Sequence, residues 1–257
     1  MDDIQCEKDE RNISIDRVGI KGLTYPVTVL DRVNGTQHSV GKIEMYVDLP
    51  RHYRATHMSR FVEVFHEYRD EITFPHIKGI LKAIKRKLSA ERAEMKVYFP
   101  YFVEKSAPIS RAKSMMKYDC TFQGTLDSVF DFVITVNVPV TALCPCSKAI
   151  SKYSAHNQRS MVSLSVRFDK FVWIEDLITL CEESASADLY SLIKRPDEKF
   201  LTEKAYENPR FAEDLAREVA SRAEARPEIV WYAVEIENIE SIHAHNAYAF
   251  LKKDKRK

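Results

Sequence analysis

The 257-residue sequence lacks two features that would place it in a membrane or on nucleic acid. It contains no run of about 20 apolar residues, the length that a membrane-spanning helix needs. It has no charge excess, since 39 lysines and arginines face 38 aspartates and glutamates. The N-terminal segment is acidic and polar, unlike a secretory signal. We therefore expect a cytoplasmic protein that binds neither nucleic acid nor a membrane and has a sizeable core, since 45% of its residues are hydrophobic.

Cysteine is scarce and odd in number, which argues against a disulfide framework. The five residues are Cys6, Cys120, Cys144, Cys146 and Cys181. Only one residue separates Cys144 from Cys146, which is too short for an easy disulfide between them. We interpret the cysteines as reduced thiols or metal ligands, and we assign no function to Cys6, Cys120 and Cys181.

Low-complexity segments and residue-level repeats are also missing, so hydrophobic periodicity is the main guide to secondary structure. In the first half it predicts strands at 25–31, 38–49 and 95–103, and helices at 59–70 and from Pro75 to about 94. Asn34-Gly35 is the expected hairpin turn, and Ser59 is the expected N-cap of the first helix. In the second half it predicts strands at 116–126, 131–142, 161–168, 229–237 and 247–251, and helices at 173–186 and 208–225. This order indicates an α+β fold with antiparallel strands and helices on one face, preceded by a flexible arm at 1–22.

The Leu143-Cys144-Pro145-Cys146-Ser147-Lys148 segment follows an apolar strand, and loops at strand ends often carry catalytic groups. Pro145 stiffens the turn, and Ser147 is a candidate cap for a short helix that ends near Tyr153. Such a helix would place both cysteines at its N-terminus, where the helix dipole favours thiolate. The alternative is that two small cysteines simply pack in a loop.

His156 lies twelve residues after Cys144, and together they make half of a thiolate–imidazole metal site. A catalytic site needs a third protein ligand and an open position for water. Asp197 and Glu198, between predicted helices, are both candidates for that ligand, and the neighbouring cations are candidates for phosphate binding. The alternative is an ordinary solvated loop at 194–199.

Two further segments contain polar groups suited to catalysis or to anion binding. On an extended strand, His243 and His245 would point to the same face, where paired imidazoles can act as acid and base. They are also candidate metal ligands, or simply exposed histidines of a polar hairpin. His57, Ser59 and Arg60 stand at a predicted helix N-terminus, where backbone N–H groups favour anions. The alternative there is an ordinary capped helix.

Five segments occur in the order found in type IB GTP cyclohydrolases, and from about residue 12 to 251 the chain resembles that family. The segments are 56–61, 143–148, 155–160, 194–199 and 240–245. The resemblance implies that GTP and water are converted into 7,8-dihydroneopterin triphosphate and formate, the first step of tetrahydrofolate synthesis. It also implies a bimodular tunnelling fold, with modules of about 23–110 and 111–257, and a homotetramer with active sites at subunit interfaces.

The resemblance also assigns site residues. It places a divalent metal (Mn²⁺, Zn²⁺, Mg²⁺ or Fe²⁺) on Cys144, His156 and Glu198, and favours Cys144 over Cys146, whose role stays open. The catalytic residues it implies are Cys144, Glu240 and His243. Those it implies for substrate binding are Glu213 as purine anchor, with Glu207 as second choice, and His57, Arg60, Arg159, Lys194, Arg195 and His245. Two alternatives remain, a tunnelling-fold reductase of a 7-deazaguanine nitrile and a non-catalytic metal-binding protein.

Overall fold

The computed structural model describes residues 9–68 and 72–256 of the chain. The chain divides into two compact units, Met1–Pro100 with Thr121–Val133, and Tyr101–Cys120 with Ile134–Lys257. The expected modules of about 23–110 and 111–257 meet at a single boundary. In the division by compactness, the tip of the hairpin formed by β3 (Ala93–Ser106) and β4 (Lys113–Leu126) belongs to the second unit. The tip of the next hairpin, between β4 and β5 (Phe130–Leu143), belongs to the first unit.

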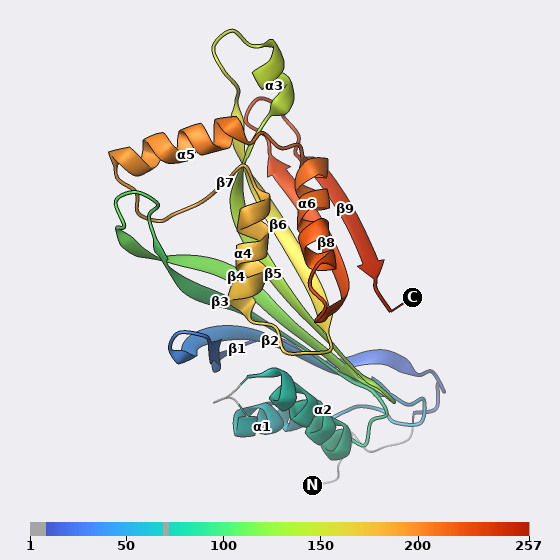
Figure 1. The fold of residues 1–257 in the computed structure, drawn as a ribbon. Coiled ribbons are helices and arrows are strands. Elements are labelled where there is room, and N and C mark those ends of the chain that lie inside the picture. Colours follow the sequence, from blue (N-terminus) through green and yellow to red (C-terminus); the bar gives the residue numbers. More distant parts are fainter. Residues whose placement is uncertain (1–8, 69–71, 257) are drawn as a thin grey trace. The chain divides into compact units, whose positions relative to one another are not determined.

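In the first unit, β1 (Ile15–Asp31), β2 (Gly35–Leu49) and β3 form antiparallel pairs in chain order. The Asp31 carboxylate accepts hydrogen bonds from the backbone N–H groups of Val33 and Asn34, and Gly35 has a φ of +79°. Glycine adopts this left-handed conformation without steric cost, so the predicted turn at Asn34-Gly35 is confirmed. Two helices, α1 (Met58–Tyr68) and α2 (Phe74–Leu88), pack against each other and contribute seven buried side chains (Figure 1). These are Phe61, Val64, Phe65, Ile77, Ile80, Leu81 and Ile84.

Three expectations for the first unit need correction. Residues 15–22 of the expected arm are part of β1, while residues 1–8 lie outside the described residues. Helix α1 begins at Met58, so Ser59 lies inside its first turn and is not the N-cap, and the expected end at Asp70 also lies outside the described residues. Helix α2 ends at Leu88 because Ser89 adopts the left-handed conformation (φ 52°) and donates its N–H to the carbonyl of Lys85.

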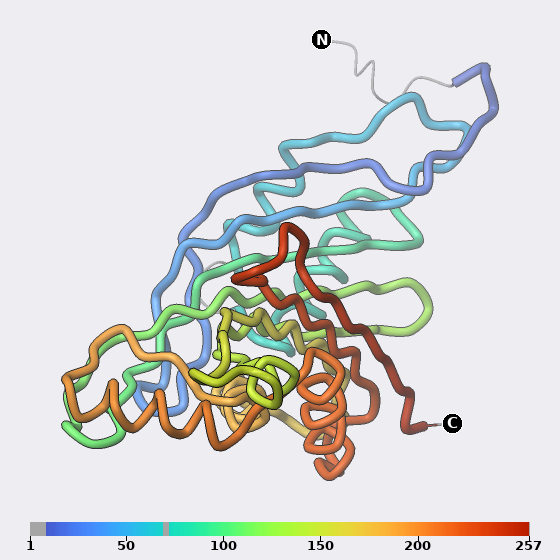
Figure 2. The backbone as a smooth tube through the Cα atoms, turned by 90° about the horizontal axis from the view of Figure 1, so that it is seen from above, coloured from blue at the N-terminus to red at the C-terminus, as the bar shows by residue number. Residues whose placement is uncertain are grey.

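In the second unit, β5, β6 (Asn157–Phe168), β8 (Ile229–Ile239) and β9 (Ala247–Asp254) form an antiparallel series. The short β7 (Ala187–Asp188) pairs with β5 near its C-terminal end. Helices α4 (Ile174–Ser184) and α6 (Ala212–Glu224) pack side by side and bury apolar faces that include Leu177, Cys181, Leu215 and Val219. Strands β8 and β9 form the hairpin at the C-terminal end of the chain (Figure 2). The expected α+β class with antiparallel strands is confirmed.

The run at 194–199, for which a solvated loop was one interpretation, begins a helix, α5 (Arg195–Glu207). Its signals were present in the sequence, since Pro196 suits a first helical turn and two carboxylates follow it. Because α5 has few apolar residues, periodicity did not reveal it. Helix α6 correspondingly begins at Ala212, not at residue 208. No helix within 9–68 or 72–256 is long and apolar enough to cross a membrane.

Gly124 of β4 packs directly under α2, and a methyl group there would be too close to two side chains. An added Cβ would lie 2.6 Å from Ile77 Cγ2 and 3.0 Å from Leu81 Cδ1. We therefore expect Gly124→Ala to lower the free energy of unfolding by about 1–3 kcal/mol, measured by urea denaturation.

Gly79→Ala, within α2, is the matched control. Its Cβ would meet only Tyr68 Cε1, at 3.7 Å, and alanine is the better helix former. This variant is expected to gain up to about 1 kcal/mol. A Gly124→Ala protein as stable as the wild type would contradict the close packing of β4 on α2.

Candidate active site

Cys144 stands where β5 ends and a short helix, α3 (Pro145–Ile150), begins. It is the N-cap of α3, and its Sγ accepts a hydrogen bond from the N–H of Ser147 at 3.4 Å. The predicted helix N-terminus at the cysteines is therefore confirmed, although the cap is Cys144 and not Ser147. Cys144 is half-buried, whereas Cys146 is exposed. Both are free thiols, as are Cys120 and Cys181, while Cys6 lies outside the described residues.

His156 is held beside Cys144 by the strand ladder. The N–H of Cys144 donates to the carbonyl of His156 at 3.1 Å, and the next pair in the ladder is Leu143 with Asn157. The His156 Nδ1 lies 3.0 Å from Ser241 Oγ, in the loop between β8 and β9. When Nδ1 donates to that hydroxyl, Nε2 carries the lone pair that a metal needs. In that tautomer, Nε2 of His156 could accept a metal ion.

Glu240 reaches the same end of the sheet because β6 lies between β5 and β8. Arg159 of β6 pairs with Thr141 on one side and with Ile239 on the other. Gln158, which is buried, donates from Nε2 to Glu240 Oε1 at 3.3 Å. Strand pairing thus gathers the segments that hold Cys144, His156 and Glu240, as Figure 1 shows for α3 and the β8–β9 loop.

Asp197 and Glu198 are neighbours with opposite environments. Asp197 is fully buried and accepts four hydrogen bonds, from Ile109 N, Ser110 N, Ser110 Oγ and Lys194 N at 2.6–2.8 Å. Burial alone would raise the pKa of this carboxyl, but the hydrogen bonds from Ser110, Lys194 and Ile109 outweigh it and hold the pKa well below its usual range. Glu198 is exposed. Asp197 is therefore committed to the fold, and Glu198 is the carboxylate available for a ligand.

Helix α5 packs against the segments that contain the other two candidate ligands. Leu143, Ala187 and Ala205 form a small buried cluster, and Ala155 and Leu201 pack on it. Leu143 directly precedes Cys144, and Ala155 directly precedes His156. On α5, residues 198, 201 and 205 share one helix face. Glu198 therefore lies on the face of α5 that is directed to the Cys144 and His156 segments.

The three candidate ligands suit a divalent metal, although a single chain does not gather them fully. Among the described residues, no three His, Cys, Asp or Glu side chains cluster tightly enough to hold a metal ion. The donor set itself is a thiolate, an imidazole and a carboxylate, which suits zinc and related first-row metals. With Cys144 and His156 adjacent and Glu198 exposed nearby, the residues fit such a metal.

The two C-terminal histidines lie in the loop between Ile239 and Ala247, so the condition that they stand on an extended strand is not met. Their rings nevertheless stack, with centroids 5.2 Å apart and 28° between the planes. Asn246 Nδ2 donates to Glu237 Oε1 at 2.7 Å and ties the end of the loop to β8. His243 and His245 are both exposed, so protons can reach them from solvent.

The candidate substrate residues fall into two groups. His57 and Arg60 belong to the first unit, where an Arg60 guanidinium N–H donates to the carbonyl of Lys87 at 3.1 Å near the end of α2. The others belong to the second unit and are exposed; they are Arg159, Lys194, Arg195, Glu207, Glu213 and His245. Glu213 lies in the first turn of α6, and Glu207 is the last residue of α5.

Sequence reasoning missed Gln158, Ser241 and Ser110, all of which contact candidate site residues. Gln158 had a weak signal, because it alternates with Ser160 and Val162 on the buried face of β6. Ser241 stood inside a segment already singled out. Ser110 gave no signal, since 87 residues separate it from Asp197.

Comparison with known proteins identifies the family. A sequence model described as type I GTP cyclohydrolase FolE2 matches residues 1–249. The chain belongs to the FolE2 family of GTP cyclohydrolases. GTP cyclohydrolase FolE2 of Syntrophotalea carbinolica is 54% identical over 251 residues, which cover 98% of this chain and 94% of the relative. That of Citrifermentans bemidjiense is 52% identical over 255 residues, or 99% and 96% of the two chains.

Solved structures with a similar fold are urate oxidases of low sequence identity. A highly active mutant of Bacillus sp. TB-90 urate oxidase has a TM-score of 0.57 at 6% identity, covering 93% of this chain and 100% of that one. Uricase from Arthrobacter globiformis has a TM-score of 0.52 at 11% identity, covering 92% of each chain. At such identities the likeness concerns the fold alone, and it confirms the expected tunnelling fold.

The buried thiols are expected to resist alkylation. Burial raises the pKa of Cys120 and Cys181, so at neutral pH both remain protonated and weakly nucleophilic. Iodoacetamide treatment of native protein, followed by peptide mass spectrometry, should leave both unmodified. In urea, both should be alkylated along with Cys144 and Cys146. Rapid labelling of Cys120 in the native protein would contradict the structure.

Proposed function

We propose that this chain is a metal-dependent GTP cyclohydrolase, which converts GTP and water into 7,8-dihydroneopterin triphosphate and formate at the first step of tetrahydrofolate synthesis. The observation that supports this most is the strand pairing that gathers Cys144, His156 and Glu240, in a chain that matches the FolE2 family over residues 1–249. The family match gives no support to a nitrile reductase or to a non-catalytic metal-binding protein.

Cys144, His156 and Glu198 would hold the metal. A bound divalent ion lowers the pKa of water and so supplies a nucleophile at neutral pH for attack on C8 of guanine. Mn²⁺, Zn²⁺, Mg²⁺ and Fe²⁺ are all candidates. A set that contains both thiolate and imidazole suits zinc and iron better than the hard ion magnesium.

Side chains of the β8–β9 loop would transfer the protons. The His243 ring, stacked on His245, can donate a proton to N7 as the imidazole ring of guanine opens. Glu240, to which Gln158 donates a hydrogen bond, is a nearby carboxylate that can accept a proton. Later ring closure to the pterin needs further transfers, for which His245 is available.

Recognition of GTP would rest on one carboxylate and a set of cations. Glu213 can accept hydrogen bonds from guanine N1–H and the 2-amino group together. A base without these two donors would leave a carboxylate unsatisfied, so the pair discriminates strongly. The candidates for the triphosphate are His57, Arg60, Arg159, Lys194 and Arg195, with His245 as a further substrate contact.

We further propose a cytoplasmic homotetramer with active sites at subunit interfaces. Large apolar side chains near the candidate site are exposed in the single chain: Ile150 (86%) and Tyr153 (85%) follow Cys144, and Ile242 (65%) follows Glu240. Exposed apolar groups beside a polar site are typical of protein interfaces. A second subunit that covers them would also enclose the site.

The activity test is incubation of purified protein with GTP and Mn²⁺ or Zn²⁺, followed by oxidation and detection of a fluorescent pterin. Cys144→Ala and Glu198→Gln are each expected to lower kcat/KM by at least about 100-fold, because each removes a metal ligand. The matched control is Glu203→Gln, the same change of side chain on the same helix, which removes only an exposed ion pair to Lys199.

Absence of pterin with every divalent metal would contradict the proposed activity. A Cys144→Ala variant with full activity would contradict the metal assignment alone.

A further inference from the structure

Helix α5 has unusually little apolar burial. Its only buried residues are Asp197 and Ala205, whereas α4 buries six residues and α6 buries five. Apolar packing normally determines where a helix lies on a sheet. We therefore look to polar contacts for what determines the position of α5.

The first polar contact fixes the start of α5. The Asp197 carboxylate receives hydrogen bonds from two consecutive backbone N–H groups, those of Ile109 and Ser110, at the turn between β3 and β4. Ser110 Oγ donates to Oδ2 at 2.6 Å, and Lys194 N donates to the same oxygen at 2.8 Å. A buried carboxylate with four donors has one favourable orientation, because any rotation leaves a buried partner unsatisfied. The first helical turn, which includes Glu198, is thereby tied to the β3–β4 turn.

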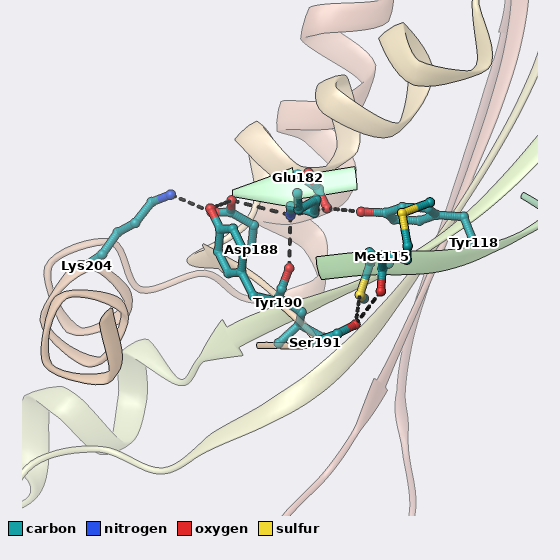
Figure 3. Close-up of polar contacts among 10 residues, drawn as sticks. Met115, Tyr118, Glu182, Asp188, Tyr190, Ser191 and Lys204 are labelled. Carbon is teal, nitrogen blue, oxygen red and sulfur yellow. Dashed lines mark hydrogen bonds and ion pairs between the residues drawn. The ribbon is translucent and has the colours of Figure 1, made fainter. Parts of the chain in front are cut away.

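The second polar contact fixes α5 further along its length (Figure 3). Lys204 Nζ donates to Asp188 Oδ1 at 2.6 Å. Lys105 of β3 donates to Glu182 Oε1 at 2.7 Å and to the carbonyl of Leu189 at 2.9 Å, and it lies 3.6 Å from Asp188 Oδ2. The Lys105, Glu182 and Asp188 side chains are only 11–15% exposed, so solvent screens the contacts among them little. The Lys204 side chain is 40% exposed, so its ion pair with Asp188 is screened more. Two points of α5 are therefore held, directly or through Asp188, by the β3–β4 hairpin.

We infer that Asp197, with Ser110 as its partner, is a positioning residue that holds Glu198 in place for metal binding. The Lys105–Asp188–Lys204 network supports the same helix from its second contact point. This inference rests on the proposed role of Glu198 as a metal ligand. A purely structural role would lower stability without changing how the folded protein binds a metal.

The test compares metal binding by Ser110→Ala and Asp197→Asn with that of the wild type. Zn²⁺ affinity is measured by competition with a chromophoric chelator, and coordination by the visible spectrum of the Co²⁺-loaded protein. Loss of a group that is hydrogen-bonded directly to a metal ligand typically costs 10–100-fold in metal affinity, and we take this range as the upper bound for residues that act on Glu198 through the helix start. We expect about 10-fold weaker binding for Ser110→Ala and up to about 100-fold for Asp197→Asn, with an altered Co²⁺ spectrum in both. Ser110→Thr keeps the hydroxyl and should restore wild-type binding.

The control is again Glu203→Gln, which lies in the same helix but outside the buried contacts, and it should bind Zn²⁺ as the wild type does. All measurements are made below the melting transition of each variant. If Asp197→Asn does not fold, the same Zn²⁺ and Co²⁺ measurements on Ser110→Ala and Lys105→Met test the positioning role.

The outcomes separate the two proposals. Wild-type protein without Zn²⁺ binding, or a Glu198→Gln variant with wild-type affinity, contradicts the proposed ligand. A Glu198-dependent affinity that is unchanged in Ser110→Ala and Asp197→Asn, even with lowered melting temperatures, overturns the positioning role alone.

Discussion

The candidate site depends on the position of β6 between β5 and β8. Because both pairings are antiparallel, the start of β6 lies beside the end of β5 and the end of β8. Three chain segments with polar side chains therefore meet at one end of the sheet. One precedes α3, one precedes β6, and one follows β8. Each segment lies at or just beyond the end of a strand, and the buried ladder behind it provides a rigid scaffold for the site.

The third part of the site depends on a contrast between two adjacent carboxylates. Asp197 is fully buried and has its oxygens saturated with hydrogen bonds, whereas Glu198 is exposed and shares a helix face with Leu201 and Ala205, which pack near Leu143 and Ala155. Asp197 stabilises the helix start, and Glu198 is the carboxylate that we propose as a metal ligand. The same short segment therefore both begins α5 and supplies the candidate ligand.

Much of the fold was predictable where local signals and burial agreed. The Asn34-Gly35 turn, helices α1 and α4 and most strands followed from periodicity and turn chemistry. Where the predicted secondary structure was wrong, the element depends on polar or backbone features and not on a periodic pattern of apolar residues. Helix α5 was missed because a buried aspartate and polar contacts hold it instead of an apolar stripe. The predicted helix α2 was too long because Ser89 adopts a left-handed conformation and ends the helix. A glycine at this position would have indicated the helix end in the sequence, but the residue is a serine.

The sequence by itself determined the family and the chemical types at the site, because five motifs in order, with Cys144, His156, Glu198 and the Glu240–His245 segment among them, are specific at the level of residues. The resemblance already favoured Glu198 over Asp197, and only the tertiary structure gave the physical reason, which is that Asp197 is buried and fully hydrogen-bonded. The tertiary structure also showed that Ser241 contacts His156, that Gln158 contacts Glu240, and that the β3–β4 turn holds α5. These contacts join residues up to 88 positions apart in the chain. A hydrogen bond between residues so far apart leaves no local pattern in the sequence.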